Sequence, residues 1–161
     1  MNLRKQLLHA LVAAVCLIAT TSAVLALPDD PQNRLTKNRR KWESKWESKA
    51  TKNYQYEFQR ICFCLPASTR RVKITVREGV AENIQRADSG DAVDRAQYEL
   101  YFTVDQLFDY IQAAIDKKAH LVKVTYDPEL GYPTLVEIDQ IKNAIDDEMR
   151  FKTGKLVVEK Q

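Results

Sequence analysis

The residues with the clearest potential for chemistry are Cys62 and Cys64, which stand in the stretch RICFCLPAS with only Phe63 between them. Two thiols this close can form a structural disulfide, act as a redox-active pair, or stay reduced as buried or metal-binding groups. Soft-metal binding fits least well, because the chain beyond residue 26 adds only His120 and Met149 as soft or borderline ligands, and neither is near in sequence. A structural disulfide, a redox-active pair and buried reduced thiols all remain open.

The geometry of a regular strand works against a bond between these cysteines. Cys62 and Cys64 keep the parity of the alternating residues 54–58, so an unbroken strand would turn both thiols toward one face. Their Cα atoms would then lie about 6.5–7 Å apart, at or past the upper limit for an unstrained disulfide. A bond therefore requires a bend in the chain, which agrees with the presence of Pro66 shortly afterwards.

A disulfide across so short a spacing adds little stability. The loop-entropy relation gives about 1.6 kcal/mol for a ring of this size, against about 3 kcal/mol for a loop of about 15 residues. Arg60, Arg70 and Arg71 are near the pair in sequence, and a facing guanidinium lowers a thiol pKa, which favours the redox-active pair. An arginine beside a strand is also common at a solvated edge, so these residues do not decide the matter.

The first 26 residues have the layout of a secretory signal peptide. Arg4 and Lys5 precede an uncharged apolar run, and residues 24–26 (VLA) form the expected cleavage site. The apolar run over residues 7–27 is also long enough to serve as an uncleaved membrane anchor instead. We therefore expect an exported protein, periplasmic or secreted, in which residues 27–34 form a flexible lead rich in Pro and Asp.

The remaining chain is long enough for one domain, which we expect over residues 35–160. The formal net charge of +3 gives no reason to expect a nucleic-acid partner. The repeat KWESKWESK has a period close to one helical turn and places Trp42 and Trp46 on one face of a helix. We expect this helix to pack its tryptophans on the domain's own sheet, and a second interpretation is weak contact of both tryptophans with a membrane surface.

Hydrophobic periodicity predicts the elements of the first part of this domain. Alternation over residues 54–59 indicates a strand with one wet face, and residues 72–85 indicate a hairpin. The next loop contains Gly and Asp and precedes a helix, for which Thr103 and Gln106 supply a capping box. This helix should end near residue 117 and cover the sheet with its apolar stripe.

Three more strands follow the second helix. Two of them flank a turn at residues 128–133, and residues 149–159 indicate a last strand that bends at Gly154. We therefore expect an α+β fold: an antiparallel sheet of about six strands with the helices on one face, in the element order αβββ-αβββ.

Further catalytic and ligand-binding signals are weak. His120 has no nucleophile turn of the G-x-S-x-G type to accompany it. The acidic clusters at 88–94 and 146–148 lack the D-x-D-x-D-G spacing of a calcium loop. The chain has only four glycines, too few to suggest a phosphate-binding loop. We therefore expect a noncatalytic domain with no catalytic residues, no metal site and no cofactor.

Three motifs follow one another along the chain. They are Y-x-Y-x-F with C-F-C (residues 54–64), T-V-x-x-L-F (103–108), and Y-D-P-E-L-G-Y-P-T (126–134) with a downstream I-D and D-D-E. Together they resemble a family of small exported bacterial proteins known only as a domain of unknown function, over roughly residues 38–158. The resemblance implies a secreted or envelope-attached single domain, often lipid-anchored in relatives, with no assigned catalytic residues.

The Y-D-P-E-L-G-Y-P-T motif has a structural and a functional interpretation. In the first it is a hairpin turn, in which Gly131 supplies an unusual backbone angle and the carboxylate of Asp127 caps the turn. In the second it is a recognition loop with its two tyrosines as anchors. The residues of this loop are Tyr126, Asp127, Pro128, Gly131, Tyr132 and Pro133.

From these patterns we expect an exported, noncatalytic domain that binds an envelope or extracellular protein or another surface component. The competing hypothesis is a thiol/disulfide-active protein that works through Cys62 and Cys64. The two hypotheses differ in whether the cysteines are required for activity.

Overall fold

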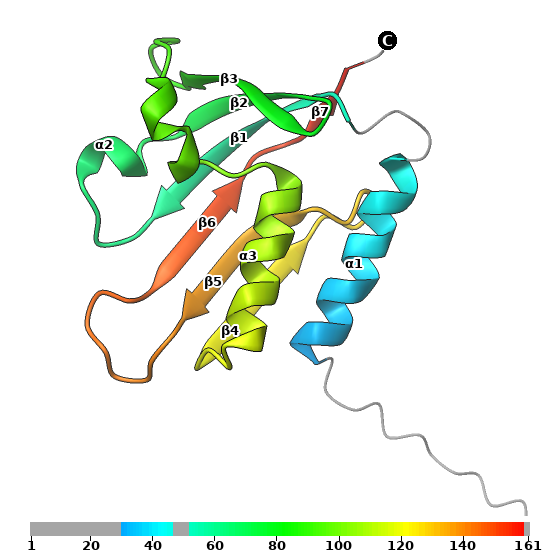
Figure 1. Cartoon of the computed structure of the whole chain (residues 1–161), viewed down its shortest axis with the longest axis vertical. Coiled ribbons are helices and arrows are strands. Elements are labelled where there is room, and N and C mark those ends of the chain that lie inside the picture. The colour runs from blue at the N-terminus through cyan, green and yellow to red at the C-terminus, as the bar shows by residue number, and fades with distance from the viewer. Residues whose placement is uncertain (1–29, 47–51, 160–161) are drawn as a thin grey trace, which may run out of the picture.

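Two long helices lie on one face of a seven-stranded antiparallel sheet (Figure 1). The computed structural model describes residues 30–46 and 52–159, so the predicted signal peptide lies outside the described residues. The helices are α1 (Pro31–Trp46), α2 (Pro66–Thr69), the 3₁₀ helix η1 (Arg95–Leu100) and α3 (Val104–Asp116). The strands are β1 (Tyr54–Ile61), β2 (Val72–Arg77), β3 (Val80–Arg86), β4 (Leu121–Tyr126), β5 (Pro133–Asp139), β6 (Met149–Thr153) and β7 (Val157–Val158).

The sheet has the strand order β3-β2-β1-β6-β5-β4, and neighbouring strands are antiparallel. The α+β class and the order αβββ-αβββ are confirmed, with α2 and η1 as short additions. Each half is a meander, and the halves join where β1 lies beside β6. The expected last strand is divided at Gly154, whose N–H donates to Glu57 O at 2.8 Å, so that β7 continues along β1 beyond β6.

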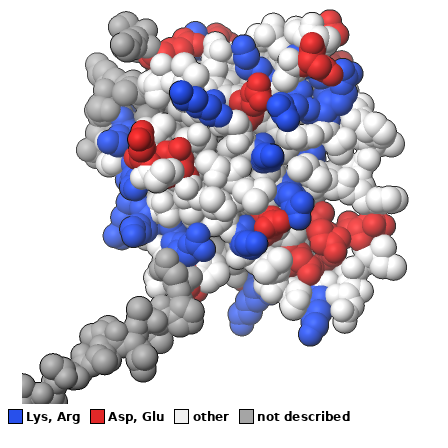
Figure 2. All heavy atoms as spheres, turned by 180° about the vertical axis from the view of Figure 1, so that it is seen from behind, with Lys and Arg blue, Asp and Glu red and all other residues white. Residues whose placement is uncertain are grey.

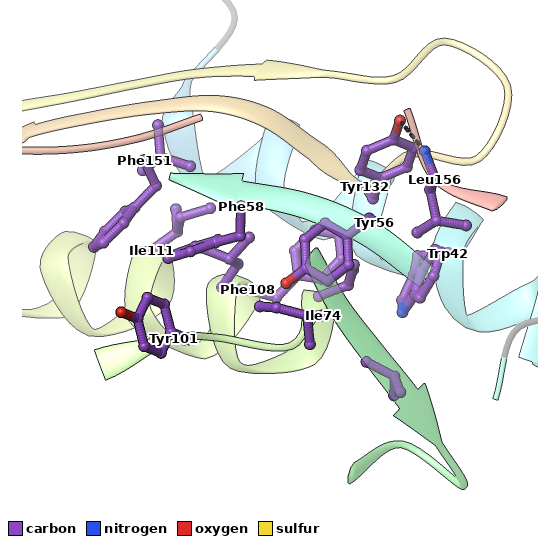
Figure 3. Packing of buried hydrophobic residues seen from close by; sticks show 14 of the residues in the cluster. Trp42, Tyr56, Phe58, Ile74, Tyr101, Phe108, Ile111, Tyr132, Phe151 and Leu156 are labelled. Atoms are coloured by element: carbon purple, nitrogen blue, oxygen red, sulfur yellow. Dashed lines mark hydrogen bonds between the residues drawn. The ribbon is translucent and has the colours of Figure 1, made fainter. Parts of the chain in front are cut away.

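The alternation in β1 decides which face of the sheet is covered. Tyr54, Tyr56 and Phe58 are buried beneath the helices, and the intervening side chains point to the helix-free face. Figure 3 shows aromatic rings from the strands packed against α1 and α3. The largest fully buried side chains are Trp42, Tyr54, Tyr56, Tyr101, Phe58, Phe108, Phe151, Leu35, Ile74, Ile84, Leu107 and Ile111.

The helix α1 begins at Pro31, a residue type suited to the first turn because that turn leaves its N–H groups unpaired. Residues 31–34, which the sequence placed in a flexible lead, are therefore helical. Trp42 is fully buried, and its Nε1 donates a hydrogen bond of 3.0 Å to the carboxylate of Asp105. Burial raises the pKa of Asp105, although this hydrogen bond acts in the opposite direction.

The burial of Trp42 confirms that α1 packs on its own domain. The indole of Trp42 is fully buried and so presents no surface to lipid in this structure. The side chain of Trp46 lies outside the described residues. Among residues 30–46 and 52–159 no helix has the length and apolar character needed to cross a membrane.

The start of α3 has the predicted capping box. Thr103 Oγ1 accepts from Gln106 N at 3.4 Å, and the Gln106 side chain accepts from Thr103 N at 2.8 Å. These bonds satisfy donors that the first helical turn leaves free, and they fix where α3 begins. The helix then lays its apolar stripe over β4 and β5 and contacts α1 (Figure 1).

Candidate functional site

The chain leaves the sheet at Ile61 and bends through Cys62–Cys64. The two sulfurs lie 2.04 Å apart, at disulfide distance, and the two Cα atoms are 5.3 Å apart. The regular strand thus ends before the cysteines, which is the bend that the sequence required for a bond. Cys64 is exposed, and Phe63 between the cysteines is 85% exposed. The short ring therefore presents an aromatic side chain to solvent.

The three arginines near the cysteines in sequence have partners elsewhere. The guanidinium of Arg60 lies 5.6 Å and 5.7 Å from the ring centroids of Phe102 and Phe151, and burial lowers its pKa. The remaining two form ion pairs, Arg70 with Asp88 at 2.5 Å and Arg71 with Glu57 at 3.3 Å. These contacts remove the argument that neighbouring arginines lower a thiol pKa, which had favoured a redox pair.

Large apolar side chains gather at this end of the sheet. The carboxyl ends of β1 and β5 meet the amino ends of β4 and β6 here, together with the loop over residues 140–148 (Figure 1). Six of the eight exposed large hydrophobic residues described lie on these elements or in the loop over residues 62–65 that follows β1: Ile61, Phe63, Leu65, Leu121, Ile141 and Ile145. Because soluble proteins rarely gather large apolar side chains on one exposed surface, this set is the candidate binding surface. We call it the apolar end.

A groove of about 270 Å³ opens within the apolar end. Its apolar wall includes Ile61, Phe63 and Leu121, and the disulfide borders it through Cys62. Its polar side includes Glu137, Asp139, Glu148 and Arg150. The groove therefore combines an apolar wall with a set of carboxylates.

Glu137 is already neutralised within the protein. Its carboxylate lies 2.7 Å from Arg150 and 3.5 Å from Lys123. Asp139 and Glu148 have no ion pair in the described part of the chain. Acidic side chains gather at this end of the helix-free face, at the lower right of Figure 2.

Three buried side-chain atoms lack a hydrogen-bond partner within residues 30–46 and 52–159, and all three belong to this end of the sheet. They are Arg60 Nε, Asp139 Oδ1 and Asp147 Oδ1. Buried polar atoms are usually paired, because a buried donor or acceptor without a partner costs free energy. Their concentration here marks the region as one whose polar groups the fold itself leaves unsatisfied.

The Y-D-P-E-L-G-Y-P-T loop lies at the other end of the β4–β5 hairpin and packs on α1. Asp127 Oδ1 accepts from Glu129 N at 3.0 Å and from Leu130 N at 2.7 Å, so the carboxylate caps the turn as predicted. Gly131 has φ +83, and a Cβ there would lie 2.6 Å from Asn38 O. The glycine therefore permits both the backbone angle and the close approach of α1.

The two tyrosines of this loop face inward. Tyr132 is buried against Trp42, and its hydroxyl accepts from Leu156 N at 3.3 Å (Figure 3). Tyr126 is half-buried and stacks on Phe108 with centroids 6.3 Å apart, and burial raises its pKa to about 12. Tyr132 is enclosed and Tyr126 is partly enclosed, so these contacts support the structural interpretation of the loop.

The remaining loop residues agree with that interpretation. Pro133 is buried at the start of β5, and Pro128 is exposed, with its carbonyl accepting from Lys41 Nζ at 2.7 Å. The loop thus joins α1 to the hairpin by polar as well as apolar contacts. The structure brings the six predicted loop residues together, and keeps them away from Cys62 and Cys64.

The sequence did not single out most of the apolar end. Ile141 and Ile145 lie in a polar loop, Leu65 follows the C-F-C motif, and no periodicity connects the three. The run NAIDDE could have been noticed, because an isoleucine followed directly by three carboxylates in a loop is a poor candidate for the core. Among the described residues there is no group of three or more His, Cys, Asp or Glu arranged to hold a metal ion.

Comparison with known sequences assigns most of the chain to one family. Residues 34–158 match the sequence profile of a family described as "Family of unknown function (DUF6174)". No curated protein and no solved structure matches the chain.

Proposed function

The chain belongs to DUF6174, a family of unknown function, and on that footing we propose that it is an exported, noncatalytic domain that binds an envelope or extracellular protein through its apolar end. The observation that carries the proposal is Phe63, 85% exposed at the tip of a two-cysteine ring and beside a groove of about 270 Å³. Exposed aromatic side chains next to pockets are typical anchors of protein interfaces. Export is supported by the signal-like layout of residues 1–26.

The stability that the disulfide adds is too small to explain why the ring around Phe63 is present. A disulfide that closes so small a ring contributes at most about 1.6 kcal/mol. It does restrict the backbone on both sides of Phe63, and a side chain held in place loses less conformational entropy on binding. We therefore assign the disulfide the task of presenting Phe63.

The proposal is tested by placing a photoreactive phenylalanine analogue at position 63 in cells that export the protein. Irradiation should cross-link one defined partner, and the same analogue at Val80 should not. Val80 is 68% exposed and lies at the start of β3, at the opposite end of the sheet, so it controls for random collision. The purified partner must then bind the wild-type protein and bind the Phe63→Asp variant at least tenfold more weakly. Equal binding by both proteins would refute the proposal.

A second candidate function is thiol/disulfide exchange through Cys62 and Cys64. The exposure of Cys64 favours it, because an exchange partner must reach the sulfur. Alkylation followed by mass measurement along a glutathione redox series separates the two functions. A pair that stays oxidised until potentials below about −300 mV is structural, and reduction near about −120 to −200 mV would indicate an exchange protein.

A further inference from the structure

Resting on the proposed function, we infer that the groove at the apolar end takes a polypeptide segment in which an apolar side chain stands next to a lysine or arginine. The groove of about 270 Å³ falls just below the usual range for ligand pockets, about 300–1,000 Å³, which suits one or two large side chains. Phe63 at the edge of the groove is 85% exposed, and Leu65 and Ile145, 80% and 88% exposed, extend the apolar surface beyond it. A polypeptide can fill the groove and cover these side chains at once.

The charge of this region selects a cationic ligand. Residues 137–150 contain five carboxylates against Lys142 and Arg150. Arg150 is already paired with Glu137 at 2.7 Å. Asp139 and Glu148 line the groove with no ion pair in the described chain, so a ligand cation would meet uncompensated negative charge there.

Carboxylate oxygens without a hydrogen-bond donor also favour a cationic ligand. Asp139 Oδ1 and Asp147 Oδ1 are buried and accept no hydrogen bond from the residues described. A carboxylate oxygen needs a donor, and an ammonium or guanidinium group carries several. Asp139 lines the groove and Asp147 does not, so a lysine or arginine beside the apolar anchor would pair with the carboxylate of Asp139 in a charge-assisted hydrogen bond.

The same charges argue against a lipid surface as the occupant. Exposed Phe, Leu and Ile on neighbouring loops are also found where proteins dip into a bilayer. Such proteins surround the apolar residues with Lys and Arg, because bacterial and cytoplasmic leaflets carry anionic lipid. Here Asp146, Asp147 and Glu148 stand directly beside Ile145, and they would be repelled by an anionic surface.

The test measures the affinity of the purified protein for three short fluorescent peptides by fluorescence polarisation. In the first, a central Leu-Phe-Leu is flanked by lysines; in the second, by glutamates; in the third, lysines flank Ser-Gly-Ser. The lysine-flanked apolar peptide should bind at least tenfold more tightly than either of the remaining two. Its affinity should fall as salt is raised, because the selective contacts are between exposed charges.

Matched variants locate the binding. Glu148→Gln should weaken the lysine-flanked apolar peptide about fivefold, the upper range for one exposed ion pair, and Asp139→Asn with Glu148→Gln should weaken it further. Glu129→Gln makes the same chemical change at the opposite end of the β4–β5 hairpin and should have no effect. Phe63→Asp should weaken both apolar peptides, and the circular dichroism of each variant shows that it is folded.

Failure of this inference is distinguishable from failure of the proposed function. If both apolar peptides bind with equal affinity and the binding of both requires Phe63, the preference for a cation is wrong but the apolar end is still the binding surface. If no peptide binds with a Kd below about 1 mM, the inference is wrong. The proposed function is then tested separately by the cross-linking at position 63. If the protein instead sediments with phosphatidylglycerol vesicles in a Phe63-dependent way, lipid is the occupant and both are overturned.

Discussion

The C-F-C loop and the Y-D-P-E-L-G-Y-P-T loop lie at opposite ends of the same sheet, and their aromatic residues differ in exposure to solvent. Phe63 is 85% exposed, whereas Tyr132 is 4% exposed and packed on Trp42. The second loop is covered by α1, which contacts it through Lys41, whereas the residues described leave Phe63 of the first loop exposed. An aromatic residue in a motif is therefore a candidate anchor only where no element of its own domain covers it.

The first and largest predicted effect is a loss of stability at alkaline pH, to which the tyrosines of the second loop contribute and the C-F-C loop does not. Burial raises the pKa of Tyr126 to about 12 and also raises the pKa of Tyr132. In the unfolded chain tyrosine ionises near pH 10. Their contribution to the free energy of unfolding is therefore complete below about pH 10 and is lost as the pH rises toward the folded-state values.

We accordingly expect the fold to be lost as the pH rises above about 10, since Tyr54 and Tyr56 in the core also have raised pKa values caused first by burial. Tyrosinate absorbance and circular dichroism, followed together during a titration, check this. The two signals should change in one step. Ionisation of these tyrosines near pH 10 with an unchanged circular dichroism would show that they are not enclosed.

The second prediction removes the buried aromatic ring of the covered loop. Tyr132→Ala deletes the contact with Trp42 and the hydrogen bond from Leu156 N, so it should lower the free energy of unfolding by about 3–5 kcal/mol. Urea denaturation measures the change. A loss below about 1 kcal/mol would mean that the loop does not hold α1 in place, and the comparison with the C-F-C loop would fail.

The third prediction concerns the backbone of the same loop. Gly131 and Gly90 both have positive φ, at +83 and +78. An added Cβ would meet Asn38 O at 2.6 Å at Gly131, and nothing within 4 Å at Gly90. Gly90→Ala should therefore cost about 1–2 kcal/mol for the backbone angle alone, and Gly131→Ala about 2–4 kcal/mol. Equal losses would show that α1 does not press on the loop.

Most of the fold followed from local patterns. Alternation predicted β1, the capping box at Thr103 predicted the start of α3, and Gly154 marked the break between β6 and β7. These signals are short-range, because they depend on residues within one or two turns of each other. The start of α1 was misplaced by four residues, since Pro31 suggests a lead as readily as a first helical turn.

The candidate site was only half predictable. Cys62 and Cys64 stood out by spacing, but the groove beside them needs Leu121 and Met149 from strands that lie far along the chain. Which strand neighbours which is a long-range property, and β1 beside β6 could not be read from periodicity. The sequence left both interpretations of the second loop open for the same reason, because the contacts of its tyrosines with α1 depend on long-range packing.

The fourth prediction tests the ring of the C-F-C loop. Cys62→Ser with Cys64→Ser should lower the free energy of unfolding by at most about 1.6 kcal/mol, because a ring this small restricts few unfolded conformations. Thermal or urea denaturation of both proteins measures this. The same variant should bind the lysine-flanked apolar peptide several-fold more weakly, since Phe63 is no longer held between two bonded cysteines. A loss near that of Tyr132→Ala would make the disulfide a main support of the fold.

The smallest effect on stability is expected at Phe63 itself. Phe63→Ala removes a side chain that is 85% exposed, so the free energy of unfolding should change by no more than about 0.5 kcal/mol. The same variant should lose at least tenfold in affinity for the lysine-flanked apolar peptide, measured by fluorescence polarisation. Tyr132→Ala is its counterpart, because it makes an equal truncation in the covered loop and should lose stability. If Phe63→Ala destabilised the protein as strongly, the ring would be packing on the domain, and the distinction between a covered structural loop and an uncovered binding loop would be lost.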